Sequence, residues 1–441
     1  MLMKIIADLH VHSRFSRACS TDLSIANLEK WAKVKGVGLL GTGDFSHPKW
    51  ILELKSELSE DGTGILRTKT GFPFVLQNEI SLIYTQGGKG RRVHLVVLAP
   101  SFAVVEKITS YLLSKGRIDY DGRPMFNISC IEFSKAMRMI SDEIEIIPAH
   151  AWTPWFGVFG SKTGFDTLEE AFGSEVSHIH AIETGLSSDA EMNRSLSKLD
   201  KINLVSSSDL HSYWPWRIGR EATLFDVPEL SYKNILNAIR TGKGLAGTIE
   251  VDPSYGKYHF DGHRLCGVSM SPEESKKNKG ICPKCKRPMT IGVLNRVEEL
   301  ADRSSPVNVP FSVKLIPLHE LISFSLGSAM ASKKVWAEYY NILKAGKDEY
   351  DILLNVPEEE LLKVTSKEIV ELIMKNRRAE LTVKPGYDGE YGVLMVDGKE
   401  AAVGDDGGDS SEKKSEEKKK DDLAEKKPAA LKTQKGLGEY F

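Results

Sequence analysis

Short apolar runs alternate with amphipathic segments over residues 1–250 of the chain. The runs have the length of buried strands, and they read KIIADLHVH, VGLLGTGD, FPFVLQNEI, VHLVVLAP, IEIIPAH, HIHAIETG and INLVSSSDLH. The segments between them carry apolar residues at helical spacing and end on the Gly or Lys typical of a helix C-terminus, as in LSIANLEKWAKVKG and YKNILNAIRTGK. We therefore predict an α/β domain over residues 1–250, folded as a parallel sheet or a barrel of βα units.

Acidic residues and histidines lie at or just past the C-terminal ends of these apolar runs. In a barrel of βα units those ends converge on one face, where active sites are built. Side chains far apart in the sequence are therefore expected to become neighbours. They are Asp44, Glu79, His150, Glu183 and Asp209.

The first run ends in DLHVHS, which places an acid and two histidines at alternate positions. Side chains alternate along a strand, so Asp8, His10 and His12 are predicted to share one face. Two buried imidazoles beside a carboxylate are costly unless something neutralises and orders them. We interpret the stretch as part of a metal site, with a polar strand end as the alternative. Asp209 and His211 have the same alternate spacing as His10 and His12.

The candidates are too many for one ion, so two or three divalent metals are predicted, as Zn²⁺, Mn²⁺ or Mg²⁺. Such clusters polarise a phosphoryl group and ionise a water molecule. Histidine and carboxylate together suit zinc or manganese better than magnesium. His178 and His180 precede Glu183, and we expect them to pack or cap rather than to bind metal.

A second metal site is predicted after residue 250, where the rhythm breaks into a lysine-rich module over residues 251–313. An HxxC pair is followed about 15 residues later by a CxxC pair, the spacing of a structural zinc ribbon. The four residues are His263, Cys266, Cys282 and Cys285. Between Lys257 and Arg296 there are nine Lys or Arg against three Asp or Glu, so the module either contacts phosphates or only braces the barrel.

Aromatic residues gather just after the proposed ligands, in AHAWTPWFGVFG and LHSYWPWRIGR. Such rings could stack on a base that has left a duplex, or they could form a hydrophobic lid over the loops. The candidates for DNA or lesion contact are Trp152, Trp155, Trp214, Trp216 and Arg217.

The end of the chain is predicted to carry a tethered peptide. Residues 314–397 have a mainly helical pattern, and residues 398–433 are low in large apolar residues and rich in mixed charge, as in a disordered linker. The last residues, 434–441, read QKGLGEYF. They resemble the PCNA-binding (PIP-box) motif by which replication and repair proteins dock on the PCNA sliding clamp, which implies anchoring roles for Gln434, Leu437, Tyr440 and Phe441.

Composition narrows the class of protein only a little. The chain has 441 residues and a formal net charge of −2, and its five cysteines are too few for a disulfide framework. It has no run of eighteen apolar residues and no signal-peptide pattern. We therefore expect an intracellular protein with no membrane partner.

The order DLHVHS, TGD, QNE, PAH and SSSDLHS resembles the polymerase-and-histidinol-phosphatase (PHP) superfamily of metal-dependent phosphoesterases. The resemblance implies a distorted (β/α)7 barrel with a multi-metal site at its C-terminal face. The usual Thr-Asp-His is Gly43-Asp44-Phe45 here, with His47 two residues on. Either Asp44 or His47 could supply that ligand or act in catalysis. The ligands implied by position are His10, His12, Glu79, His94, His150, Asp209 and His211.

The whole domain order, from barrel through zinc ribbon and helical domain to clamp-binding tail, resembles the archaeal endonuclease Q family. That resemblance implies a DNA repair endonuclease that cuts on the 5′ side of uracil, hypoxanthine, xanthine or an abasic site. The implied enzyme hydrolyses the phosphodiester with several metal ions while the damaged nucleotide is flipped out of the helix. Its products have a 3′-hydroxyl and a 5′-phosphate. The implied partners are damaged DNA, double- or single-stranded, and PCNA, in the cytoplasm at the nucleoid of an archaeal cell. The alternative is a small-molecule phosphatase such as a histidinol-phosphate phosphatase.

Overall fold

A ring of strands forms the core of the N-terminal domain in the computed structural model, which describes residues 2–396 and 398–400. Strand β2 pairs in parallel with β1 and β5, β6 is antiparallel to both β5 and β8, and β9 and β10 form a separate parallel pair. The ring consists of β1 (Met3–Asp8), β2 (Leu39–Gly41), β5 (Pro73–Gln86), β6 (Lys89–Ala99), β8 (Glu145–Pro148), β9 (Ala181–Glu183) and β10 (Asn203–Val205).

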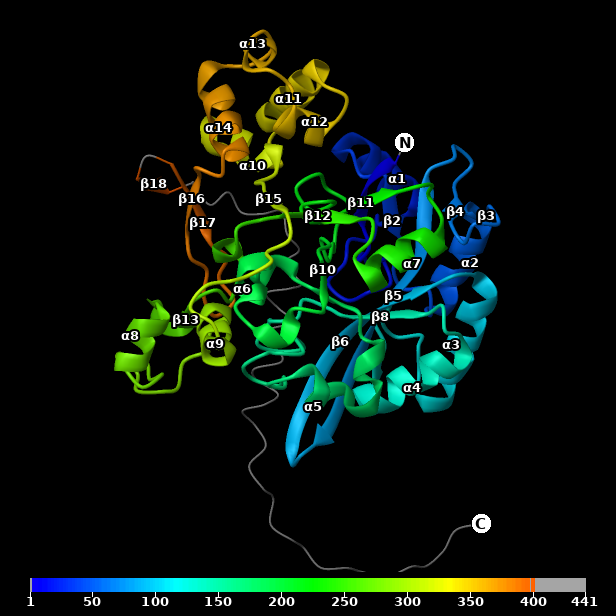
Figure 1. Cartoon of the computed structure of the whole chain (residues 1–441). Coiled ribbons are helices and arrows are strands. Elements are labelled where there is room, and N and C mark those ends of the chain that lie inside the picture. The colour runs from blue at the N-terminus through cyan, green and yellow to red at the C-terminus, as the bar shows by residue number, and fades with distance from the viewer. Residues whose placement is uncertain (1, 397, 401–441) are drawn as a thin grey trace, which may run out of the picture.

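Only a few backbone contacts close this ring. The Ala151 amide donates to the Glu183 carbonyl at 3.0 Å, which joins the end of β8 to β9. A bridge between Val11 and Leu210 joins the segments that follow β1 and β10. The expected α/β barrel is therefore confirmed, as a distorted barrel held at its C-terminal rim rather than by continuous ladders (Figure 1).

The sheet is mixed rather than parallel throughout. Gly87 and Gly88, both at positive φ, turn β5 directly into β6 as a hairpin, because glycine adopts left-handed conformations without steric cost. On the other side β1 is antiparallel to β11 (Ala222–Val227), which is antiparallel to β12 (Leu245–Glu250). Short strands β3 (Ser59–Glu60), β4 (Leu66–Arg67), β7 (Met125–Phe126) and β15 (Ser312–Lys314) extend the edges.

Helices cover the outside of the barrel, and five of the seven begin at a serine or threonine cap. Ser24, Ser101, Ser129 and Ser231 each accept a hydrogen bond from the backbone amide three residues on, which satisfies a donor that has no partner within the helix. The helices are α1 (Ile25–Lys35), α2 (Pro48–Glu57), α3 (Phe102–Lys115), α4 (Cys130–Ile140), α5 (Leu168–Phe172), α6 (Ala190–Arg194) and α7 (Tyr232–Thr241).

The cysteine-bearing module stands beside the barrel and also includes strands from the end of the described chain. It contains β13 (Asp261–His263), β14 (Val268–Met270), α8 (Pro272–Lys277) and α9 (Val293–Leu300). The sheet of β16 (Thr382–Lys384), β17 (Val393–Val396) and β18 (Lys399–Glu400) packs back onto it. The Phe260 amide donates to the Gly386 carbonyl at 3.0 Å and the Gly386 amide donates to the Ser254 carbonyl at 2.8 Å. Regular structure thus extends past residue 397, to Glu400 (Figure 1).

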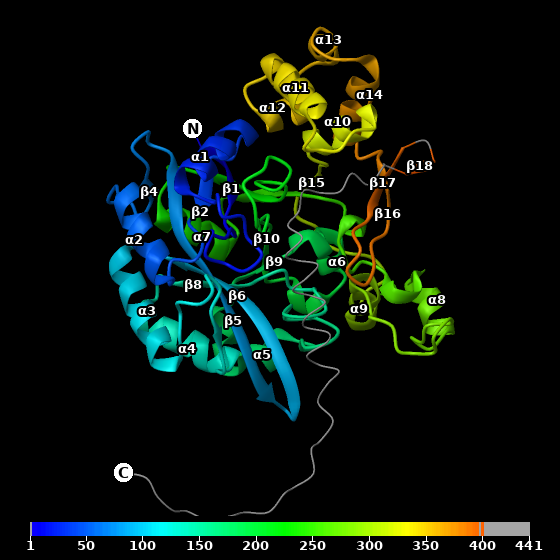
Figure 2. The ribbon, with the colours of Figure 1, turned by 180° about the vertical axis from the view of Figure 1, so that it is seen from behind.

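A separate helical unit lies over the α1 end of the barrel (Figure 2). It consists of α10 (Leu318–Leu326), α11 (Lys333–Ile342), α12 (Glu349–Leu354), α13 (Glu358–Leu361) and α14 (Lys367–Arg377). The ammonium group of Lys35 on α1 and the carboxylate of Glu349 on α12 form a fully buried ion pair at 2.6 Å. This pair fixes the helical unit to the barrel.

The predicted clamp-binding residues Gln434, Leu437, Tyr440 and Phe441 lie outside the described residues. Within the described ranges, no helix is both long enough and apolar enough to cross a bilayer.

Candidate metal centre

Segments that follow different strands bring seven predicted residues to one rim of the barrel. His10 and His12 come just after β1, Glu79 and His94 lie within β5 and β6, and His150 follows β8. Asp209 and His211 follow β10. These are the expected strand ends, except that the β5–β6 hairpin supplies two residues from the middle of its strands.

Glu79 stands between two groups of possible ligands. Its Oε2 lies 3.1 Å from His12 Nε2 and 3.5 Å from His10 Nε2, and Asp209 Oδ1 lies at the same distances from these two nitrogens. Its Oε1 lies 2.7 Å from His94 Nδ1 and 3.2 Å from His150 Nε2. The first group is therefore His10, His12, Glu79 and Asp209, and the second is Glu79, His94 and His150. Within each group the ligand atoms lie within 4.8 Å of one another. A carboxylate shared in this way can bridge two cations.

Buried carboxylates behind the ring hold His10 and His12 in one orientation. Glu183 accepts from His10 Nδ1 at 3.0 Å, and Asp44 accepts from His12 Nδ1 at 3.1 Å. These bonds place a proton on Nδ1 of both residues, so Nε2 is the atom that could bind a cation beside Glu79 and Asp209. Such carboxylate–histidine pairs are the usual second layer of a metal site.

The donor set fits a divalent cation. His10 is completely buried, and its Nε2 has no hydrogen-bond partner among the residues that the structure describes. A lone pair that faces carboxylate oxygens is repelled unless a proton or a cation lies between them. Burial opposes the charged imidazole, yet Glu183, Asp209 and Glu79 raise the pKa of His10 well above its ordinary value. The cluster therefore attracts positive charge, and imidazole with carboxylate suits Zn²⁺ or Mn²⁺.

Asp44 and His47 lie outside both ligand groups in the described part of the chain. Asp44 accepts hydrogen bonds from the Ser13 amide at 2.7 Å, the Ser13 hydroxyl at 2.6 Å and the Ser16 hydroxyl at 2.9 Å, in addition to His12. Burial alone would raise its pKa, but the bonds from His12 and Ser13 hold that pKa below its ordinary value. Asp44 thus contacts His12 through its carboxylate in this structure.

His47 is buried, and its ring stacks on Phe15 with centroids 4.4 Å apart. Burial is also the main reason that the pKa of His47 is below its ordinary value. His47 is thus packed against Phe15 and lies outside both ligand groups found among the described residues.

His211 lies at the rim, beside the first group. Its ring centroid is 4.8 Å from that of His12, and its Nδ1 lies 2.9 Å from the Asp209 carbonyl. It lies outside the two groups found among the described residues.

Arg123 is a site residue that the sequence pattern did not reveal. Its Nη1 donates to Glu79 Oε2 at 3.0 Å, and its side chain keeps 22% of its surface exposed. The Asp121 carboxylate holds the loop by accepting from the Arg123 amide at 3.2 Å. At Gly122 a Cβ would lie 2.2 Å from an oxygen of Asp44, so this loop can approach the site only with glycine there. The loop has no apolar periodicity that could have predicted its position.

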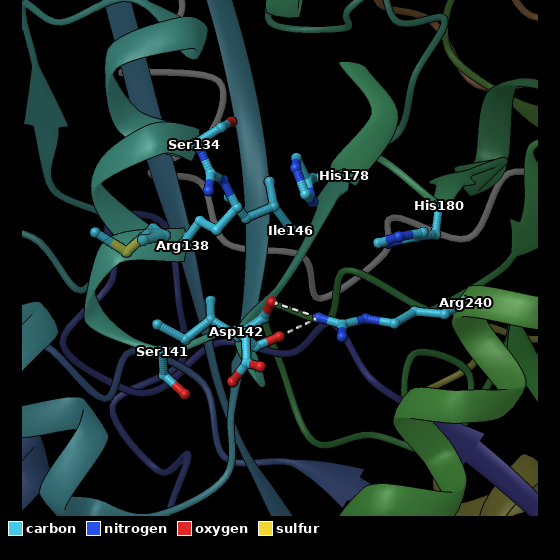
Figure 3. A pocket seen from close by; sticks show the side chains of 10 residues that line it. Ser134, Arg138, Ser141, Asp142, Ile146, His178, His180 and Arg240 are labelled. Atoms are coloured by element: carbon cyan, nitrogen blue, oxygen red, sulfur yellow. Dashed lines mark hydrogen bonds between the residues drawn. The ribbon is translucent and has the colours of Figure 1, made fainter. Parts of the chain in front are cut away.

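His178 and His180 lie elsewhere, as expected. They line a cavity of about 140 Å³ together with Arg138 and Arg240 (Figure 3). Glu145, the first residue of β8, accepts from His180 Nδ1 at 3.0 Å and from Arg240 Nε at 2.6 Å. This cavity is at the N-terminal ends of β8 and β9, away from the metal cluster at their C-terminal ends.

The five residues proposed to contact DNA divide by exposure. Trp152 is fully buried and donates from Nε1 to Asn193 at 2.8 Å, and Trp216 is buried against His319. These two rings are structural and have no free face for a base. Trp155, Trp214 and Arg217 are partly exposed, so they remain candidates.

The predicted zinc ribbon brings its four residues together. The ligand atoms of His263, Cys266, Cys282 and Cys285 lie within 4.8 Å of one another, with Cys285 Sγ 3.3 Å from His263 Nδ1. Desolvation opposes the Cys282 thiolate, but backbone amides of Cys285 and Lys284 lower the pKa of Cys282 to about 6. Closed sets of one histidine and three cysteines are typical of structural zinc.

Comparisons of the sequence with known proteins find relatives in archaea and bacteria. Residues 317–380 match the MJ0043 C-terminal domain. Protein MJ0043 of Methanocaldococcus jannaschii is 32% identical over 286 residues, which cover 63% of this chain but only 35% of that protein. Protein YqxK of Bacillus subtilis is 28% identical over 411 residues, which cover 89% of this chain and all of YqxK. The chain thus spans about a third of the first relative and the whole of the second.

Two solved structures match the fold over almost their full length. One is endonuclease Q in complex with a 27-mer duplex substrate that has an abasic lesion at the active site. It has a TM-score of 0.81 and 31% identity, and the match covers 89% of this chain and 97% of that one. The other is the lesion-specific endonuclease PfuEndoQ from Pyrococcus furiosus, with a TM-score of 0.80, 30% identity and coverage of 89% and 96%. Together with the metal-ligand geometry, these matches show that the chain belongs to the endonuclease Q family.

Proposed function

We propose that this protein is a metal-dependent DNA repair endonuclease that cuts the strand 5′ to a deaminated base or an abasic site. The observation that carries the proposal is the Glu79 carboxylate between two histidine-rich groups, in a chain that matches endonuclease Q from the barrel to the helical unit. The proposed substrates are uracil, hypoxanthine, xanthine and abasic sites in double- or single-stranded DNA, with 3′-hydroxyl and 5′-phosphate products.

The chemistry divides between the ions and the protein. When bound, divalent ions would polarise the scissile phosphate and ionise a water molecule. Glu79, His10, His12 and Asp209 would hold one ion, and Glu79 would share the other with His94 and His150. Arg123 contacts Glu79 with one guanidinium nitrogen and has the geometry to bind a phosphate oxygen with others. We propose that it stabilises the negative charge that builds up on the phosphate during hydrolysis.

Selection of the lesion requires access to the pairing edge of the base, since deamination replaces an amine there with a carbonyl. We therefore propose that the damaged nucleotide leaves the helix, with Trp155, Trp214 and Arg217 at the rim. The basic zinc-ribbon module would contact phosphates. The tail at residues 434–441 would tether the enzyme to the PCNA clamp, and a protein with these partners would work at the nucleoid.

The test uses metal-loaded protein and end-labelled duplexes with uracil, hypoxanthine, an abasic site or no lesion, in Mn²⁺ or Mg²⁺. We expect cuts 5′ to each lesion and none in the undamaged duplex, and the product ends are checked by ligation. His10→Ala and Asp209→Ala should abolish cutting while they leave DNA binding within a few-fold of wild type. Phosphate release from histidinol phosphate without cutting of any duplex would replace the proposal with the small-molecule phosphatase.

A further inference from the structure

Four partly exposed aromatic residues form a row across the junction between the barrel and the helical unit. Tyr213 and Trp214 have ring centroids 4.7 Å apart, Trp214 and Trp336 are 5.6 Å apart, and Trp336 and Tyr340 are 5.6 Å apart with ring planes only 26° from parallel. We call these four residues the aromatic row. Tyr340, at one end of the row, is 48% exposed.

A buried layer of rings holds the aromatic row in place. Trp214 stacks on Trp216 with ring planes 7° from parallel, and the Trp336 ring packs 4.2 Å from that of His319. The buried layer consists of Trp31, Trp216, His319 and Tyr339. A ligand that binds to the row therefore meets rings that are already ordered, which lowers the conformational entropy cost of binding.

The row begins two residues after His211, and lysines lie on the elements that carry it, although the Asp22 carboxylate also acts on Tyr213. Tyr213 follows His211 by two residues, and the His211 ring is 4.8 Å from His12. Lys30 on α1 lies 5.0 Å over the Trp31 ring, and Lys333 and Lys334 are exposed at the start of α11. These charges suit a polyanion that runs from the cluster onto the helical unit.

We propose that the aromatic row is a stacking platform for unpaired nucleobases of the DNA strand beside the cut site. In an intact duplex the faces of the bases are stacked on one another and cannot contact protein. The rings of the aromatic row can therefore stack on bases only where the strand is unpaired. Stacking on such rings, with lysines along the backbone, is the common mode of sequence-independent single-strand binding. The inference rests on the proposed function, and it assigns a DNA-binding role to the helical unit at residues 317–380.

The direct test is the binding of oligothymidine by the full-length protein. Oligothymidine is single-stranded and contains no deaminated base or abasic site. We expect binding to quench tryptophan fluorescence, because Trp214 and Trp336 belong to the row. Tyr340→Ala should raise the Kd for oligothymidine about 5- to 10-fold, the lower end of what one stacked base contributes. Tyr340→Phe should bind like wild type, since it keeps the ring. The control is Leu113→Ala, an exposed apolar residue (58%) on α3, which lies far from α11 (Figure 1).

Three results would overturn the inference. They are an unchanged Kd in Tyr340→Ala, an equal rise in the Kd for an undamaged duplex, and a concentration-dependent dimer of wild type that Tyr340→Ala abolishes. Trp336→Leu provides a second variant, and its melting temperature shows whether the junction still folds. Failure of the proposed function is seen separately, because wild type would then bind oligothymidine but leave uracil-containing duplexes uncut.

Discussion

Replacement of Asp44 by asparagine should damage the metal site without removing any ligand. One carboxylate oxygen of Asp44 accepts from the Ser13 amide at 2.7 Å, and the other accepts from His12 Nδ1 at 3.1 Å. Asparagine has only one acceptor oxygen. The Ser13 amide is a fixed donor, so it should take that oxygen and leave the NH₂ group of the new side chain facing His12.

This exchange should invert the tautomer of His12. With an NH₂ donor on its Nδ1 side, His12 is most stable with the proton on Nε2, the atom that faces Glu79 and Asp209. A protonated Nε2 cannot bind a metal ion. Loss of a partner that orients a ligand typically costs 10- to 100-fold in metal affinity or activity, which corresponds to about 1.4 to 2.7 kcal/mol.

The assay is calorimetric titration of Mn²⁺ into metal-stripped protein, together with single-turnover cutting of a uracil duplex. We expect Asp44→Asn to weaken Mn²⁺ binding about 10- to 100-fold and to cut correspondingly slower at low Mn²⁺, with partial recovery at high Mn²⁺. His47→Gln is the matched comparison and should change the affinity less than 3-fold, because His47 lies outside both ligand groups. Wild-type affinity in Asp44→Asn, or a larger loss in His47→Gln, would refute the assignment.

Four further substitutions or deletions test separate parts of the molecule. Arg123→Ala should slow single-turnover cutting about 100-fold, as loss of a charge-stabilising donor does, and should leave Mn²⁺ affinity within a few-fold; an unchanged rate would exclude the phosphate role. Cys282→Ser with Cys285→Ser should lower the zinc content and the melting temperature, and an unaltered melting curve would mean that the ribbon holds no zinc. Burial raises the pKa of Glu250 from 4.5 to about 7, so the folded chain keeps a proton that the unfolded chain releases, and stability falls as the pH rises through this range. Glu250→Gln should therefore stabilise the protein by up to about 3 kcal/mol at pH 8 and by little at pH 4.5, which thermal melts at the two pH values would check. Deletion of residues 434–441 should weaken binding to the PCNA clamp and leave the cutting of a short uracil duplex unchanged; a loss of cutting would place the tail in the catalytic fold.

The position of the site was predictable because chain topology, rather than side-chain detail, determines it. A residue just past the C-terminal end of a buried barrel strand has little choice of location, and His10, His150 and Asp209 are all of this kind. The meeting of His263, Cys266, Cys282 and Cys285 was predictable for a similar reason, since a two-residue spacing within each pair leaves the four side chains few ways to meet.

The parts that were not predictable depend on contacts between segments without periodic patterns. Arg123 reaches Glu79 from a loop, and its place depends on the fit of Gly122 against Asp44. The different surroundings of Asp44 and His47 were not predictable either, because both follow the same strand and only their contacts, with His12 and with Phe15, distinguish them. The hairpin that carries Glu79 and His94 had a usable signal, the GGKG turn, which the expectation of a parallel sheet overlooked.

The helical unit has a fixed position relative to the metal cluster because polar groups hold it. Apolar packing between helices has no preferred direction and allows sliding, whereas a buried ion pair satisfies its partners in one register only. Lys35 donates to the Pro215 carbonyl at 3.0 Å as well as to Glu349, and Glu349 also accepts from the Tyr339 hydroxyl at 2.7 Å. Loss of one partner of such a pair costs about 3 to 5 kcal/mol. Because Pro215 lies between Trp214 and Trp216, the pair joins the ring-bearing loop of the barrel to the helices, so a strand held on those rings would lie at a fixed distance from the catalytic ions.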